Sequence, residues 1–299
     1  MPEAASRLTV IVPSVNGWGD LEGCLAALDG QSGGDHLDII VADRVGAAVR
    51  DRVRARFPRV RLLEAPARTT IPALRRLAFA AATADVVGVI EDHVIVPPDW
   101  ATRMLAAHAA GAQVVGGAVV NAATERLVDW AAFLCEYSHC LRPAAGHAEW
   151  LPGNNVTYRR ALLARFADQL ADDRWEDHLH GLLRAAGVGL ECRPDIVVGH
   201  KKHYTAGEYA GQRFLYSRSF AGARVKGAGA ARRALYGAAA CALPPLLLAR
   251  VTARVWRDGR HRGYLVASMP LLTVFVIAWA AGEVVGAWLG PGDALERVT

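Results

Sequence analysis

The chain has 299 residues, enough for one large α/β domain and an appendage. With 53% hydrophobic and only 21% charged residues, it is more apolar than an ordinary soluble protein, and the apolar excess lies between Ala234 and Gly290. The net charge of +5, carried almost wholly by arginine, suits phosphates or acidic lipid headgroups; because no nucleic-acid-binding motif accompanies it, we expect no nucleic-acid partner.

Two features indicate where the catalytic part resides. The five cysteines include no CxxC pair and are odd in number, which argues against a zinc ribbon or a disulfide framework and fits a reducing compartment. The first apolar run, Leu8–Pro13, is too short for the core of a signal peptide. We therefore expect the catalytic part to lie in the cytosol.

Short apolar runs rich in β-branched residues alternate with helical spacing over the first 120 residues or so. The predicted strands are Leu8–Pro13, Leu37–Ala42, Val60–Leu63, Val86–Ile90 and Gln113–Val120, and the predicted helices are Asp20–Leu28, Val49–Phe57, Pro72–Ala82 and one that opens at Pro97–Asp99. This alternation predicts an α/β fold with a doubly wound, mainly parallel sheet.

Polar residues follow three of the predicted strands at their carboxyl ends, where such sheets bind ligands. They are Ser14 and Asn16, then Asp43, and then the triplet Glu91–Asp92–His93. Neither a dinucleotide-binding GxGxxG after the first strand nor a P-loop occurs, so neither a dehydrogenase nor a P-loop enzyme is expected.

The strand–helix alternation ends after Asn121. A helix is predicted over Glu125–Tyr137, followed by a loop that leads to Pro152–Asn155. Trp175–Ala186 has the spacing of an amphipathic helix. Four acidic residues crowd its first turn: Asp172, Asp173, Glu176 and Asp177.

Four of these features, in this order, resemble the family 2 glycosyltransferases, which have the GT-A fold. They are the opening Val10–Asn16, the triplet Glu91–His93, the segment Pro152–Asn155 with two arginines shortly after it, and Trp175–Asp177 at the head of a helix. The resemblance implies an enzyme that moves a sugar from a nucleotide-sugar donor to an acceptor.

The resemblance also implies which residues hold the donor. Those that match the family's nucleoside and phosphate positions are Pro13, Ser14 and Asn16 for the base and ribose, Asp43 for the base, Arg75 for phosphate oxygens, and Asp92 for the ribose or a metal. A guanidinium suits phosphate because its planar fork binds two oxygens at once. The alternative for Arg75 is an exposed helix face.

The triplet stands where the family carries its Asp-x-Asp metal motif, which implies a divalent cation that neutralises the leaving diphosphate. Here its last position is His93, and His200, at the end of another apolar run, matches a metal histidine of a related GT-A family. Our metal hypothesis is thus Glu91, His93 and His200, with Mn²⁺ preferred to Mg²⁺ because imidazole suits manganese better. A solvated turn without metal is the alternative.

An inverting transfer needs a base that takes the proton of the acceptor hydroxyl. Asp177 matches the family's base, with Glu176 orienting the acceptor; the alternative is that both only complement the helix dipole. Gly153, Asn154 and Asn155 match the acceptor or donor-sugar pocket, with a tight turn as the alternative. Gln212–Arg213 departs from the motif of processive members, so we expect single-sugar transfer.

The C-terminal part has the composition of a membrane region. Residues 264–289 are long and apolar enough to cross a bilayer, whereas 234–249 are shorter and interrupted by Pro244–Pro245, which favours an interfacial or re-entrant segment. Arginines on both sides of 234–249 favour the cytoplasm for both flanks. A two-span hairpin stays open, and a buried core helix is the alternative for 264–289.

Together these features predict a glycosyltransferase domain over residues 1–222 and a membrane-attachment region over 223–299. We expect an inverting enzyme at the cytoplasmic face of the cytoplasmic membrane, acting in the cell envelope on a lipid-linked or polysaccharide acceptor. A catalytically degenerate domain serving as a membrane scaffold, and a sugar nucleotidyltransferase, are the alternatives.

Overall fold

The computed structural model describes residues 7–32, 37–168 and 175–299. They form two compact units. The first comprises the residues up to Ala122 together with Arg142–Lys201, and the second comprises Ala123–Leu141 together with Lys202–Thr299. The predicted boundary at residue 222, between a catalytic and a membrane-attachment region, stays a prediction. The compact units divide the chain elsewhere, because residues 123–141 and 202–222 are in the same unit as the apolar C-terminal helices.

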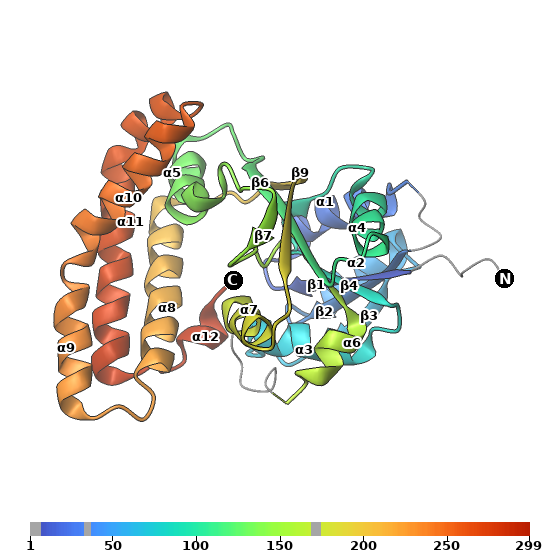
Figure 1. Ribbon diagram of the computed structural model, residues 1–299, viewed down its shortest axis with the longest axis horizontal. Coiled ribbons are helices and arrows are strands. Elements are labelled where there is room, and N and C mark those ends of the chain that lie inside the picture. Colours follow the sequence, from blue (N-terminus) through green and yellow to red (C-terminus); the bar gives the residue numbers. More distant parts are fainter. Residues whose placement is uncertain (1–6, 33–36, 169–174) are drawn as a thin grey trace. The chain divides into compact units, whose positions relative to one another are not determined.

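The first unit is built on one mixed sheet (Figure 1). Its strands are β1 (Leu8–Ser14), β2 (Leu37–Asp43), β3 (Arg61–Glu64), β4 (Val86–Val89), β5 (Val94–Ile95), β6 (Val114–Asn121), β7 (Gly146–Ala148), β8 (Val156–Arg159) and β9 (Leu190–His200), in the order β3-β2-β1-β4-β8-β6-β9-β5 with β7 beside β9. Strands β1–β4 pair in parallel, whereas β8 runs antiparallel between β4 and β6. The predicted α/β fold with a mainly parallel sheet is confirmed.

Helices cover both faces of this sheet. They are α1 (Trp18–Asp29), α2 (Ala47–Arg56), α3 (Ile71–Ala81), α4 (Trp100–Ala109), α6 (Arg160–Arg165) and α7 (Glu176–Ala185). Helices α3, α6 and α7 share one hydrophobic core with the sheet. Side chains alternate along a strand, so Gly88 faces the opposite side of the sheet from Val87 and Val89 of that core. There Trp100 of α4 packs against Gly88, and a Cβ at this position would lie 3.2 Å from the indole.

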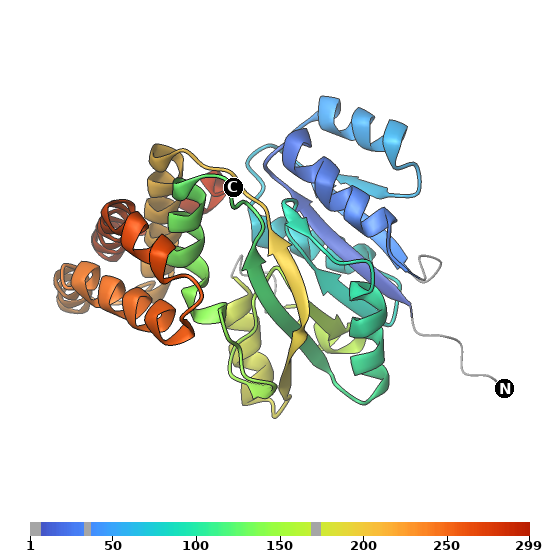
Figure 2. The same cartoon turned by 90° about the horizontal axis from the view of Figure 1, so that it is seen from above.

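The second unit consists of helices (Figures 1 and 2). They are α5 (Leu127–Tyr137), the 3₁₀ turn Ser138–Cys140, α8 (Ala206–Arg224), α9 (Ala230–Ala240), α10 (Leu243–Asp258), α11 (Arg262–Leu289) and α12 (Ala294–Arg297). Glycines let α8 and α11 approach closely: Gly282 meets Ser217 and the carbonyl of Phe214, and Gly286 meets the carbonyl of Arg218.

Within the described residues, α11 is long and apolar enough to cross a membrane, and α9 with α10 passes the same test as a pair bent by 51°. The predicted segment 264–289 therefore forms one helix. Residues 234–249 are divided between α9 and α10.

Candidate active site

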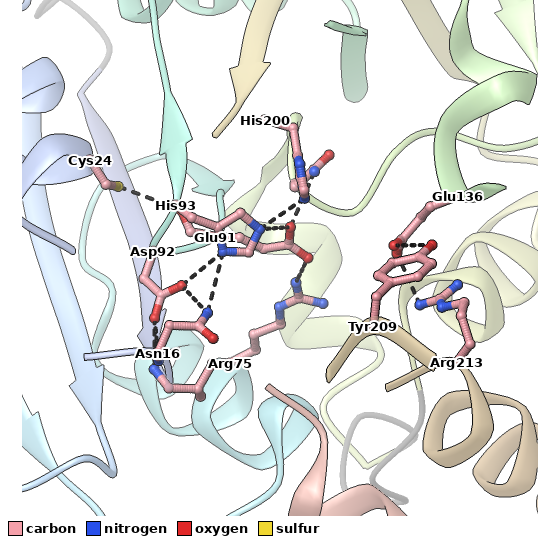
Figure 3. Close-up of polar contacts among 12 residues, drawn as sticks. Asn16, Cys24, Arg75, Glu91, Asp92, His93, Glu136, His200, Tyr209 and Arg213 are labelled. Atoms are coloured by element: carbon pink, nitrogen blue, oxygen red, sulfur yellow. Dashed lines mark hydrogen bonds and ion pairs between the residues drawn. The ribbon is translucent and has the colours of Figure 1, made fainter. Parts of the chain in front are cut away.

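The first site element is the turn after β4, which lies beside the turn after β1 because these two strands are parallel neighbours. The carboxylate of Asp92 accepts hydrogen bonds from the backbone N–H of Val15 (2.8 Å) and of Asn16 (2.9 Å), and from the Asn16 side chain (2.7 Å). Asp92 is 1% exposed. Its predicted contact with ribose or metal is untested, and in this structure its oxygens tie the two turns together (Figure 3).

The three predicted metal ligands come together at this edge. Nε2 of His93 lies 3.0 Å from Nε2 of His200 and 3.3 Å from a carboxylate oxygen of Glu91. These atoms form a cluster that could hold a metal ion. Two ligand atoms at right angles on an ion with bonds of about 2.1 Å lie about 3 Å apart, so the spacing fits a divalent cation. His200 reaches the cluster because β9 ends beside β5, which follows the triplet.

Asp92 also determines which ring nitrogen of His93 faces the cluster. Its Oδ1 lies 3.0 Å from Nδ1 of His93. Since an ionised carboxylate can only accept, Nδ1 carries the proton, and in the neutral ring the lone pair of Nε2 is left for the metal. The second ring nitrogen of a metal histidine is commonly held in this way.

The charges of the cluster are strongly coupled. Burial disfavours the imidazolium of His93, but hydrogen bonds to Asp92 and Glu91 outweigh it and raise the pKa of His93 to about 9. Burial likewise opposes ionisation of Glu91, yet the hydrogen bond and charge of His93 lower its pKa to about 2. The cluster thus carries a positive charge between two carboxylates, in the place that a divalent cation would take.

Asp92→Asn is expected to weaken manganese binding by about 10- to 100-fold. The amide can donate to Nδ1 of His93 and so favour the tautomer whose Nε2 carries a hydrogen and cannot bind metal. Manganese affinity is measured by calorimetry or by the resonance of free Mn²⁺. Asp195→Asn, at an exposed ion pair with Arg193, is the control; an unchanged affinity in Asp92→Asn would contradict the role given to this carboxylate.

Arg75 connects the acidic turn to the start of α7. It is 2% exposed, forms an ion pair with Glu176, and lies 3.7 Å from Glu91. The alternative of an exposed helix face is therefore wrong for Arg75. Its predicted contact with phosphate is untested, but the guanidinium lies beside the candidate metal ligands. Glu176 also packs against Gly153, where a Cβ would lie 2.7 Å from its carboxylate.

The two predicted asparagines have different surroundings. Asn154 donates to Glu91 at 3.2 Å and thus belongs to the cluster. Asn155 is fully buried, donates to the carbonyls of Ala118 and Ile196, and accepts from the indole of Trp100. Its side chain holds the sheet and α4 together; the predicted sugar contact of this pair, and of Gly153, is untested.

The predicted nucleoside residues lie at the same sheet edge. Ser14 and Asp43 are fully buried, and Ser14 donates to Asp43 at 2.8 Å. Asp43 also accepts from Arg50 and from the backbone N–H of Val45 and Gly46. Its carboxylate therefore has a structural role in β2 and the turn after it, and the predicted reading of the base by Asp43, with Pro13, Ser14 and Asn16 beside it, stays a prediction.

Asp177 lies exposed in the first turn of α7, next to Glu176. Arg75 links Glu176 to Glu91 of the metal cluster, and Asp177 is the next residue after Glu176. Its role as base is untested. Asp172 and Asp173, which share the predicted first turn, lie outside the described residues.

One anchor of α7 was missed in the sequence. Nε2 of His180 lies 2.9 Å from the buried hydroxyl of Tyr158 in β8. Burial lowers the pKa of His180 to about 4, so the ring is neutral. His180 stands one helical turn after Glu176, on the buried side of α7, and this spacing is the signal that could have suggested it.

The comparisons with known proteins agree with this fold. The chain is similar to the mannosyltransferase PcManGT from Pyrobaculum calidifontis, solved with GDP-Man and Mn²⁺, at 20% identity and a TM-score of 0.57, over 94% of this chain and 88% of that one. It is also similar to GalNAc-T7, solved with UDP, GalNAc and Mn²⁺, at 13% identity and a TM-score of 0.53, over 67% of this chain but 45% of that one. At these identities the likeness shows the fold.

Sequence comparison identifies the family. A search of curated protein sequences gave no match. The family model described as glycosyl transferase family 2 matches residues 9–168, which is more than half of the chain and includes β1, the acidic turn and the Pro152–Asn155 loop. The chain therefore belongs to glycosyl transferase family 2 and is a glycosyltransferase with a GT-A fold.

Proposed function

We propose that this enzyme transfers one sugar, with inversion, from a nucleotide-sugar donor to a lipid-linked or envelope-polysaccharide acceptor at the cytoplasmic face of the cytoplasmic membrane. The observation that carries the proposal is the cluster of Glu91, His93 and His200 beside the turn after β1. The nucleotides and Mn²⁺ bound by the two similar structures support a nucleotide-sugar donor and a divalent cation.

In the proposed site, Glu91, His93 and His200 hold the cation, with Mn²⁺ preferred to Mg²⁺ because two ligands are imidazoles. A divalent cation there would neutralise the negative charge that grows on the departing diphosphate. Asp92 keeps the His93 ring oriented, and Asn154 holds the carboxylate of Glu91. Arg75 places a second positive charge beside the same cluster, where it can bind a phosphate oxygen.

The acceptor side is proposed to lie at the start of α7. The carboxylate of Asp177 is exposed there, where it can accept the proton of an acceptor hydroxyl as that hydroxyl attacks the anomeric carbon. Glu176 is held by Arg75 and lies against Gly153, and it fixes where this turn stands relative to the acidic cluster. A membrane-held acceptor is supported by the apolar helices of the second unit, since attachment keeps the enzyme near a substrate confined to the bilayer.

A donor panel tests this proposal. The detergent-purified full chain is incubated with GDP- and UDP-sugars in Mn²⁺, in Mg²⁺ and in chelator, and release of the nucleoside diphosphate is measured. We expect one donor to be hydrolysed slowly in Mn²⁺, less in Mg²⁺ and not at all in chelator, and lipid-linked acceptors to accelerate release. Equal rates in Mn²⁺ and in chelator would contradict the metal-assisted mechanism.

A further inference from the structure

Helix α11 has one continuous apolar stripe that no described residue covers. Its exposed positions recur every three or four residues: Val266, Pro270, Val274, Ile277 and Ala281. Val266, Val274 and Ile277 are each more than half exposed. The buried positions of α11 face α5, α8, α9 and α10, so the helix is covered on one side and bare on the other.

Helices α9 and α10 also expose apolar side chains. Between residues 234 and 249 the exposed side chains are all apolar or cysteine, and they include Leu235 and Leu246. Helices α9 and α10 pack beside α11, as both Figures 1 and 2 show. Apolar side chains are therefore exposed on three neighbouring helices, and apolar side chains exposed together mark an interaction surface.

The contacts between α8 and α11 show that the start of α8 lies beside the midpoint of α11. The ring of Tyr209, in the first turn of α8, lies 4.6 Å from that of Phe275, the midpoint of the 28 residues of α11. Further along, Trp279 contacts Arg213 and Gly282 contacts Ser217, so the two helices run in the same direction. The polar start of α8 is thus about 20 Å from either end of α11.

That start is charged and exposed. Thr205 and Glu208 form a capping box whose hydrogen bonds are exposed, and Lys202 lies just before it. If α11 crossed a bilayer, its midpoint would lie in the hydrocarbon centre, and Glu208 would lie there with it. An exposed carboxylate at that depth is strongly unfavourable, because the hydrocarbon offers it neither water nor a counter-ion. Crossing is therefore unfavourable for this bundle.

The charges around the apolar surface suit a different arrangement. From Arg224 to Arg262 the sequence has nine basic residues and one acidic residue, Asp258, which is buried and paired with Arg260. Exposed basic residues lie on both sides of residues 234–249 in the chain: Arg224, Lys226 and Arg232 before this segment, and Arg250, Arg254, Arg257, Arg260 and Arg262 after it. Of these, Arg224 also pairs with Glu283 of α11. The negative surface potential of an anionic membrane attracts arginine and lysine side chains that lie close to it.

We propose that the second unit binds one leaflet of an anionic bilayer, with α9, α10 and α11 lying along its surface, and that α11 does not cross it. The stripe Val266–Ala281 enters the boundary between headgroups and acyl chains, and the arginines on both sides of residues 234–249 contact anionic headgroups. The apolar composition of α11 by itself predicts a membrane-spanning helix. In the proposed arrangement α11 is apolar on both sides because one side packs in the bundle and the other contacts lipid. This inference rests on the proposed membrane attachment and not on the catalytic residues.

Labelling with a membrane-impermeant maleimide tests the arrangement. The full chain carries Cys241→Ser, since the other four cysteines are buried, plus one new cysteine: Arg257→Cys before α11, Arg297→Cys after it, or Asp51→Cys in the catalytic unit as the reference. The proteins are added to sealed vesicles of phosphatidylcholine and phosphatidylglycerol. We expect all three to be labelled from outside before detergent is added. Protection of one end of α11 until detergent is added would overturn the proposal.

A second measurement tests the surface itself. Val274→Glu is expected to weaken binding to the same vesicles by about tenfold, because it places a charge where an apolar side chain enters lipid, and vesicles without phosphatidylglycerol should bind the unaltered chain less. Leu77→Glu, at an exposed leucine of α3, is the matched control and should change nothing. If Val274→Glu leaves vesicle binding unchanged but turns a dimer into a monomer, a second copy covers the surface and the proposal is wrong. Donor hydrolysis, measured in detergent without vesicles, fails or succeeds independently of both results.

Discussion

Replacing Asp177 with asparagine is expected to lower kcat by about 10²- to 10⁴-fold, the range for loss of a general base. An amide has nearly the same shape as the carboxylate but cannot accept the proton of the acceptor hydroxyl. Because Asp177 is exposed at the start of α7 and is no part of the metal cluster, donor affinity should change little. Transfer kinetics with the best donor and acceptor from the panel give kcat and KM separately.

Two variants make this result interpretable. Asp51→Asn, at an exposed acid of α2, is the control for loss of one negative charge and should keep full activity. Glu176→Gln should disturb the ion pair with Arg75 and raise KM for the donor, whereas Asp177→Asn should not. If Asp177→Asn turns over at the unaltered rate, the base lies elsewhere.

The second large effect is expected at the metal cluster. His93→Ala removes the ligand that lies next to both Glu91 and His200, and we expect manganese affinity to fall by about 100-fold or more, with kcat/KM falling at least as far. Calorimetry with Mn²⁺ measures the affinity without any turnover. His147→Ala, at an exposed histidine of β7, is the control. Retention of the original affinity in His93→Ala would exclude this cluster as the metal site.

The raised pKa of His93 predicts how stability and manganese affinity depend on pH. Without metal its pKa is about 9, raised from 6.5, so its positive charge stabilises the folded chain fully below pH 6.5, and this contribution is lost as pH rises through 9. Metal binding must displace that proton. Manganese affinity should therefore increase by about tenfold per pH unit below about pH 9 and level off above it, and this dependence should disappear in His93→Ala.

Several parts of the site could be read from the sequence because they depend on local order along the chain. Short runs rich in β-branched residues, such as Leu8–Pro13, favour buried strands, and residues that follow parallel strands meet at one sheet edge. This is why Asn16 and the triplet Glu91–His93 could be placed together in advance. Family order added His200, which is 107 residues away from His93 and has no local signal that links the two.

Only the tertiary structure decided what each side chain has for partners. Arg75 and Asn155 look alike in sequence as polar residues near motifs, yet one is paired with Glu176 beside the cluster and the other is bound to core carbonyls. Likewise the sequence of α11 determines that it is apolar, but its neighbours determine which side is buried in the bundle and which side stays exposed. The periodicity of apolar residues determines which face of a helix or strand is apolar. The hydrogen bonds and the burial of a side chain depend instead on residues that are distant in the sequence.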